Sequence, residues 1–77
     1  MGTEQAGLSA AITRNIDRIC KDRDISKHEL SERALIAKST FYRNMKEPDK
    51  FTIRETGKIA EVLEVGLIEI LTEEEQP

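Results

Sequence analysis

The chain has few residues of the kinds that carry redox chemistry or bind metals. It contains a single cysteine, Cys20, and a single histidine, His28, among 77 residues. One cysteine cannot form an internal disulfide framework, and a metal site or a catalytic nucleophile needs partner residues that the sequence does not offer. Cys20 is more simply interpreted as a small buried apolar residue. We therefore expect no enzyme, no cofactor, no metal and no small-molecule ligand.

Long apolar runs are also missing. No stretch approaches the roughly 18–20 apolar residues of a membrane span, and the N-terminus lacks the basic and apolar regions of a signal peptide. These absences predict a cytoplasmic protein without a membrane partner.

The net charge of −3 is unfavourable for binding an anion, but the charge is unevenly distributed. Four of the fifteen acidic residues lie in the termini, at Glu4, Glu73, Glu74 and Glu75. Residues 21–58 contain ten Lys or Arg and seven Asp or Glu, which is a local charge of +3. The overall charge therefore does not exclude nucleic acid.

Apolar spacing predicts helices throughout. The first stripe has steps of four, four, three and one, and consists of Leu8, Ile12, Ile16, Ile19 and Cys20. Asp24 suits the turn after it, because Asp tolerates a left-handed backbone. Two capping boxes, Ser26–Glu29 and Thr52–Glu55, mark later helix starts.

The predicted domain is all-α, with five helices over residues 8–71. It lies between a flexible lead of residues 1–7 and an acidic tail of residues 72–77. The fourth helix is predicted to bury Ile53, and Gly57 on the same face indicates that another backbone approaches closely. A short fifth helix covers residues 67–71.

The central stretch, residues 26–45, contains two short helices joined by a tight turn. Such helices meet at a steep angle, so the second one, residues 38–46, protrudes. Its inner side carries Phe41 and Met45, and its outer side is nearly free of acids. A DNA major groove admits one such helix. Arg43 suits a guanine edge, whereas Lys38 and Lys46 suit phosphates.

From about Leu8 to Leu71 the chain resembles the Cro/repressor helix-turn-helix family, with its lambda-repressor-like fold. The similar buried positions are Leu30, Ala34, Ile36 and Phe41, and the stretch 39–43 is similar to the family's recognition helix. The resemblance implies sequence-specific binding to double-stranded DNA in a bacterial or phage-infected cell. The residues expected at the DNA are Lys27, His28, Lys38, Ser39, Thr40, Tyr42, Arg43 and Lys46.

Most of these side chains also have a structural interpretation. Arg43 can form an ion pair on the helix surface, Tyr42 can pack its ring on a neighbouring helix, and Ser39 and Thr40 are common at helix starts. For His28, a solvated surface position is the simpler interpretation.

Three positions differ from the family pattern. Leu35 stands where the turn usually has Gly; a left-handed Leu is strained, so a rearranged turn is expected. Ala37 stands where Ser or Thr usually caps the recognition helix. Asn44 occupies a position that is more often apolar, and Met45 is expected to take over its packing.

The fifth helix has more apolar residues than one face can bury. Val65 and Ile68 are therefore predicted at a homodimer interface, which would suit a palindromic operator. The leading hypothesis is a phage-type Cro or repressor. The alternatives are an antitoxin or a restriction-modification controller of the same fold, and a protein-interaction module that does not bind DNA.

Overall fold

The computed structural model describes residues 3–73, with side chains from residue 10 onwards, and this part of the chain contains helices and no strands. The α-helices are α1 (Thr3–Arg23), α2 (Lys27–Arg33), α3 (Lys38–Lys46), α4 (Ile53–Leu63) and α5 (Leu67–Leu71). A short 3₁₀ helix, η1 (Pro48–Lys50), joins α3 to α4. The all-α prediction is confirmed, and α3 and α5 have the predicted bounds.

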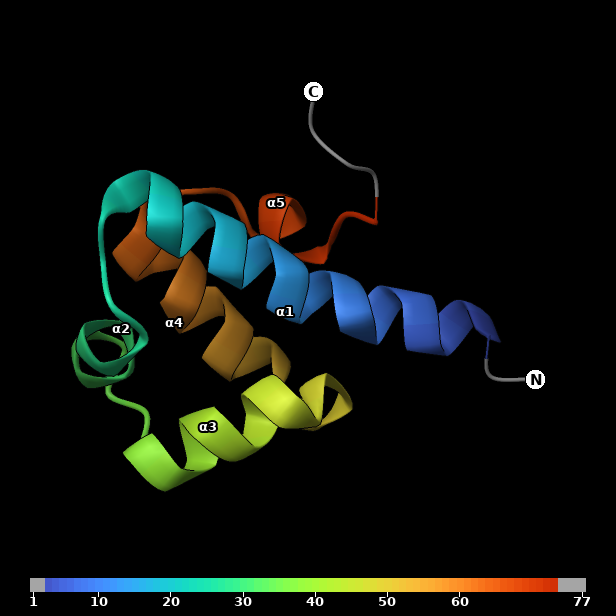
Figure 1. The fold of residues 1–77 in the computed structure, drawn as a ribbon, viewed down its shortest axis with the longest axis horizontal. Helices are drawn as coiled ribbons and strands as arrows, with labels where there is room; N and C mark the ends of the chain where they lie inside the picture. The colour runs from blue at the N-terminus through green and yellow to red at the C-terminus, as the bar shows by residue number, and fades with distance from the viewer. Residues whose placement is uncertain (1–2, 74–77) are drawn as a thin grey trace.

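Helix α1 crosses the whole molecule, with α5 on one side of it and α4 and α3 on the other (Figure 1). It begins at Thr3, whereas the apolar stripe predicted a start near Leu8. The stripe marks where the helix packs, and the first turns extend past the other helices (Figure 1). Residues 1–2 and 74–77, at the ends of the predicted lead and tail, lie outside the described residues.

One hydrophobic core holds the helices together. Its largest members are fully or almost fully buried: Ile16, Ile19, Leu30, Phe41, Ile59, Leu63 and Ile70. Cys20 is buried among them, as predicted. Asn15 fixes α5 to α1, because its buried amide donates to the carbonyl oxygens of Ile70 and Thr72, each 2.8 Å away.

Helix α4 carries the complete capping box that the sequence predicted. The Thr52 hydroxyl accepts from the Glu55 amide at 3.0 Å, and the Glu55 carboxylate accepts from the Thr52 amide at 3.1 Å. At α2 the Ser26 hydroxyl accepts from the Glu29 amide at 3.0 Å, which is one half of the predicted capping box, and the Glu29 carboxylate lies 3.6 Å from the Arg33 guanidinium.

Two predictions for α4 were wrong. Ile53 is 71% exposed, because the first turn of the helix extends past the core. Gly57 has no close neighbour: a Cβ placed on it would meet nothing within 4 Å. Close approach of another backbone therefore does not explain this glycine.

Three helices end on a residue with a left-handed backbone that is not glycine. Asp24, Leu35 and Glu64 have φ values of 58°, 60° and 60°. After each helix, the amide of the next residue reaches a carbonyl five positions back, as from Ile25 to Cys20 at 3.0 Å. These are Schellman caps, and they close the helices without the glycine that usually occupies this position.

Candidate nucleic-acid interface

The turn between α2 and α3 keeps a left-handed residue despite the absence of glycine. The Leu35 amide donates to the Glu32 carbonyl at 3.1 Å, and the Ile36 amide donates to the Ser31 carbonyl at 3.0 Å. Ile36 is buried and anchors the far side of the turn, while Leu35 is 82% exposed. The expectation of a rearranged turn was wrong, because these two hydrogen bonds and the burial of Ile36 hold Leu35 at positive φ.

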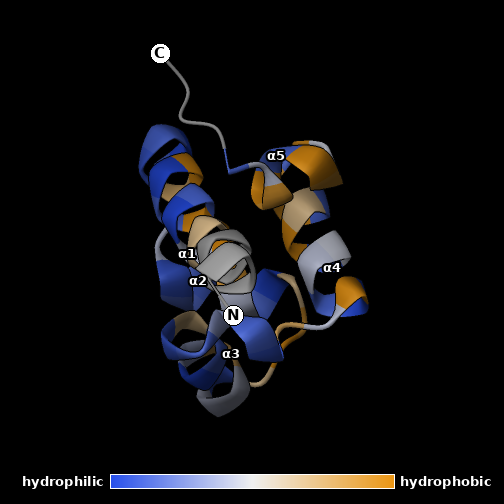
Figure 2. Ribbon diagram, turned by 90° about the vertical axis from the view of Figure 1, so that its right-hand side faces the viewer, coloured by the Kyte–Doolittle hydropathy of each residue, from blue (hydrophilic) through white to orange (hydrophobic). Residues whose placement is uncertain are grey.

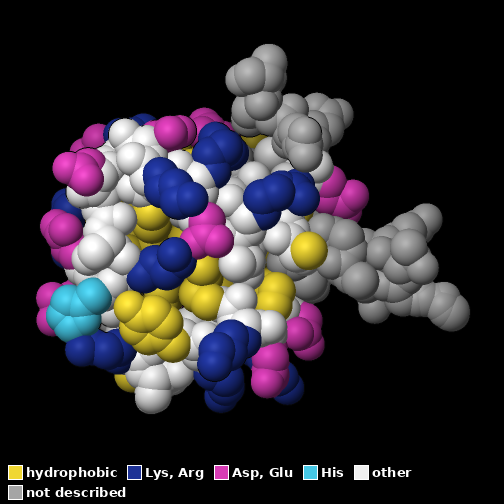
Figure 3. Space-filling model, in the orientation of Figure 1, with side chains coloured by type: hydrophobic (Ala, Val, Ile, Leu, Met, Phe, Trp, Pro, Cys, Tyr) yellow, Lys and Arg dark blue, Asp and Glu magenta, His cyan; other side chains and the backbone are white. Residues whose placement is uncertain are grey.

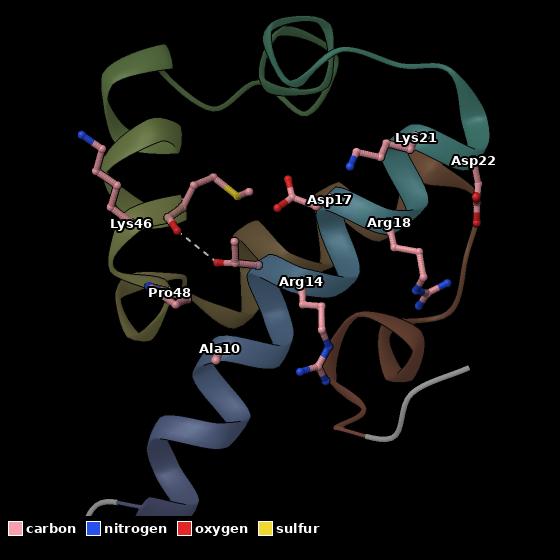
Figure 4. Close-up of a pocket in the computed structure, with 10 residues that line it drawn as sticks. Ala10, Arg14, Asp17, Arg18, Lys21, Asp22, Lys46 and Pro48 are labelled. Carbon is pink, nitrogen blue, oxygen red and sulfur yellow. Dashed lines mark hydrogen bonds between the residues drawn. The ribbon is translucent and has the colours of Figure 1, made fainter. Parts of the chain in front are cut away.

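Ala37, the N-cap residue of α3, makes no side-chain capping hydrogen bond, as the sequence predicted. The Phe41 amide donates to the Ala37 carbonyl at 2.8 Å, so the first backbone bond of the helix is formed. The other end of α3 is tied to α1, where the Thr13 hydroxyl donates to the Met45 carbonyl at 3.1 Å (Figure 4). Helix α3 is therefore fixed to the rest of the domain at its C-terminal end, whereas its first turn has no capping side chain.

The inner side of α3 differs from the prediction. Phe41 and Asn44 are fully buried, whereas Met45 is only half-buried. The prediction that Met45 takes over the packing of position 44 was wrong. Position 44 faces the start of α4, and the Asn44 side-chain amide donates to the Glu55 carboxylate at 3.1 Å.

The outer side of α3 exposes most of the side chains that the sequence predicted. Lys38, Ser39, Tyr42, Arg43 and Lys46 are exposed, and Thr40 is half-buried. The helix contains three cationic residues and no acidic one. Tyr42 also packs edge-on against Phe41, with ring centroids 5.5 Å apart, so its ring has a structural contact as well as an open side.

Arg43 is held by its neighbour along the chain. The Asn44 side-chain oxygen accepts from Nε and Nη2 of Arg43, at 3.2 and 3.0 Å. Sequence reasoning gave neither Asn44 nor Glu55 a role at the interface. The sequence did contain a sign of the role of Asn44, because it is a polar residue three positions after Phe41, on the inner side of an amphipathic helix.

Lys27 and His28, at the start of α2, are both paired with acids. Lys27 Nζ lies 2.7 Å from Asp17 Oδ1 on α1, and this hydrogen bond raises the pKa of Lys27. His28 Nε2 lies 3.1 Å from Glu32 Oε2, one turn along the same helix. Asp17 was not singled out from the sequence, because only the fold brings it to Lys27.

One face of the domain, over α1, α2 and α3, carries many Lys and Arg side chains around a group of hydrophobic ones (Figure 3). An open hollow between α1 and the end of α3 lies on this face. The side chains of Arg14 and Arg18 line it but point toward α5 (Figure 4). Arg14 donates to the Glu73 carbonyl at 3.0 Å. These two arginines therefore extend away from α3.

The two residues predicted at a dimer interface have different environments. Ile68 is 72% exposed, whereas Val65 is half-buried and packs against the core. Hydrophobic residues colour the start of α4 and much of α5 on one side of the molecule, and α3 is largely hydrophilic (Figure 2). Exposed apolar side chains also lie beside the cationic helix, because Leu35 in the turn before α3 is 82% exposed.

Other site chemistry is limited in the part of the chain that the structure describes. Residues 3–73 contain no group of three or more His, Cys, Asp or Glu side chains that could hold a metal ion. Burial raises the pKa of the Cys20 thiol, which disfavours the reactive thiolate. None of the helices within these residues is long and apolar enough to cross a membrane.

The family model of the Cro/C1-type HTH DNA-binding domain matches residues 15–76, which are 62 of the 77 residues. The chain belongs to this family. The Cro/C1-type domain is a DNA-binding, typically non-enzymatic domain, so the chain is a DNA-binding protein with a helix-turn-helix formed by α2 and α3. Comparison with curated proteins and with solved structures gave no match.

Proposed function

We propose that this Cro/C1-type protein is a phage-type Cro or repressor that places α3 in the major groove of a specific operator. The observation that carries the proposal is the outer side of α3, where exposed Lys38, Arg43 and Lys46 stand on a helix without an acid. Ser39, Thr40 and Tyr42 add hydrogen-bonding groups beside them. Such a helix suits both parts of DNA recognition, because cations attract phosphates and side chains reach base edges.

Each side chain has a distinct part in this proposal. Arg43 reads a base, since its planar guanidinium can donate twice to one guanine. Lys38 and Lys46 neutralise phosphates, as Lys27 does at the start of α2, with His28 beside it.

A titration at several salt concentrations tests whether the protein is a DNA-binding regulator or a protein-interaction module. Duplexes bound by the full chain are first selected from a random-sequence pool, and the enriched duplex and a scrambled one of equal length are then titrated. A protein that neutralises phosphates loses affinity steeply as salt rises. Affinity that does not change with salt, or a pool from which no sequence is enriched, would contradict the proposal.

Two substitutions separate base reading from phosphate contact. Arg43→Ala is expected to weaken binding to the selected duplex by about 1–3 kcal/mol and to relax preference at one position. Lys38→Ala is expected to weaken binding to selected and scrambled duplexes alike. Arg23→Ala is a matched control, because Arg23 lies at the far end of α1 and pairs with Glu64 at 3.5 Å.

Asp17 lowers the availability of Lys27 for phosphate. Asp17→Asn removes a carboxylate from the cationic face and frees Lys27, so we expect binding to any duplex to tighten by about two- to fivefold at low salt. Weaker or unchanged binding of the Asp17→Asn variant would contradict the proposed phosphate contact of Lys27.

We also propose that the protein binds a palindromic operator as a homodimer. The exposed Ile68, together with Leu67 at 36% exposure, supplies apolar surface on α5. A two-fold dimer would present its two α3 helices about 34 Å apart, one turn of DNA. Ile68→Lys is expected to convert dimers to monomers in sedimentation and to weaken operator binding. If the unmodified protein sediments as a monomer even on the selected duplex, the dimer is excluded.

A further inference from the structure

A continuous chain of hydrogen bonds joins the start of α4 to the exposed guanidinium of Arg43. Glu55 Oε1 accepts from the Thr52 amide at 3.1 Å and from the Asn44 side-chain amide, also at 3.1 Å. The Asn44 oxygen accepts from Nε and Nη2 of Arg43. The first turn of α4 therefore reaches the outer side of α3 through a single buried residue.

The chemistry of the three groups fixes the orientation of the Asn44 amide. A carboxylate only accepts hydrogen bonds and a guanidinium only donates them. The amide nitrogen of Asn44 must therefore face Glu55, and its oxygen must face Arg43. Asn44 is fully buried, so it has no freedom to turn away into solvent.

Stability does not explain an amide at this position. A buried amide is costly unless it is hydrogen-bonded, and replacing both partners of such a hydrogen bond with apolar groups of similar shape can be neutral or stabilising. The inner side of α3 packs on the core through Phe41, so an apolar residue would suit position 44. Asn44 is a polar link from Glu55 to a surface arginine.

The geometry leaves one donor edge of Arg43 free. A guanidinium donates in pairs along two edges, one formed by Nε and Nη2 and the other by Nη1 and Nη2. Asn44 occupies the first edge, and Arg43 is an exposed residue, so the second edge is accessible to a ligand. Two parallel donors match the O6 and N7 acceptors of guanine. A long side chain that is already fixed loses less freedom on binding than one that must be ordered.

We infer that Asn44 and Glu55 are positioning residues that make Arg43 selective for one base pair, and this inference rests on the proposed function. Glu55 holds Asn44, Asn44 holds Arg43, and neither positioning residue touches DNA. Removing the hydrogen bonds of either one should lower discrimination at the base pair that Arg43 reads and leave the other positions of the operator unchanged.

Parallel selections from a random DNA pool test this inference, with full-length wild type, Arg43→Ala and Asn44→Leu. In the wild-type pool we expect a discrimination of about 5- to 150-fold at the base pair read by Arg43, as for a two-donor contact to guanine. Arg43→Ala should abolish preference at that pair. Asn44→Leu, measured below its own thermal midpoint, should lower discrimination at that pair by at least about fivefold and leave the preference at the other positions unchanged.

The Glu55 variants provide an independent test, measured below the thermal midpoint of each protein. Glu55→Gln should retain the preference, because its side-chain oxygen can still accept from Thr52 and Asn44. Glu55→Ala should reduce it. Glu61→Gln is the matched control, since it removes an exposed carboxylate from the same helix.

The outcomes separate the inference from the proposed function. If wild type enriches no sequence, the proposed function fails. If wild type enriches an operator and folded Asn44→Leu keeps full preference at the pair that Arg43→Ala loses, the inference is overturned. The inference is also overturned if Arg43→Ala keeps the wild-type preference at every base pair. Should Asn44→Leu not fold, equal preference in Glu55→Ala and Glu61→Gln would overturn it.

Discussion

Helices α3 and α4 are neighbours of similar length, yet they are stabilised in different ways. Helix α4 begins with a complete capping box and buries Thr56, Ile59, Ala60 and Leu63. Helix α3 begins without a side-chain cap, follows a strained turn and buries only Phe41 and Asn44. The proposed recognition helix therefore depends on its neighbours, whereas α4 also has stabilising contacts of its own.

The largest effect is expected where α3 is joined to the core. Phe41→Ala removes the one large apolar side chain that α3 buries completely, and should lower the free energy of unfolding by about 3–5 kcal/mol. Denaturant unfolding followed by circular dichroism measures the change. A loss below 1 kcal/mol would show that other contacts hold α3 in place.

The turn before α3 should gain stability from glycine. Leu35 has φ 60° and is 82% exposed, so Leu35→Gly relieves a left-handed strain of about 1–2 kcal/mol and removes almost no packing. We expect a higher thermal midpoint. Glu32→Gly is the matched control. Glu32 is an exposed residue of α2 with a helical backbone, so glycine there should lower the thermal midpoint.

Exchanging the caps tests the comparison between α3 and α4 directly. Thr52→Ala should lower the free energy of unfolding by about 1 kcal/mol, and Ala37→Ser should raise it by a similar amount. Urea unfolding measures the free energy of unfolding of both variants. If Ala37→Ser gave no gain, the first turn of α3 would already be satisfied by its surroundings.

Gly57 offers the smallest gain. It lies inside α4, and a Cβ there meets nothing within 4 Å, so Gly57→Ala should stabilise the protein by about 0.5–1 kcal/mol. Gly66→Ala is the matched control. Gly66 also has open space around it, but it caps α5 with a non-helical backbone, where Ala brings no helix propensity and is a poorer cap than Gly.

Local patterns predicted most of the helices correctly. Capping boxes depend on residues three positions apart, and apolar stripes depend on the period of the helix, so both are visible in the sequence. The same patterns were less reliable at the helix ends. Ile53 fits the apolar face of α4 but is exposed, because periodicity shows which side of a helix is apolar and not how far the core extends.

The sequence by itself determined the all-α fold, the cap of α4 and the cationic outer side of α3, because these follow from neighbouring residues. Only the tertiary structure decided which distant groups meet. Lys27 pairs with Asp17, ten residues before it, and Asn44 reaches Glu55, eleven residues after it, because packing brings separate helices together. At Leu35 the left-handed backbone is held by two local hydrogen bonds at the end of α2, and the tertiary structure adds the burial of the next residue, Ile36.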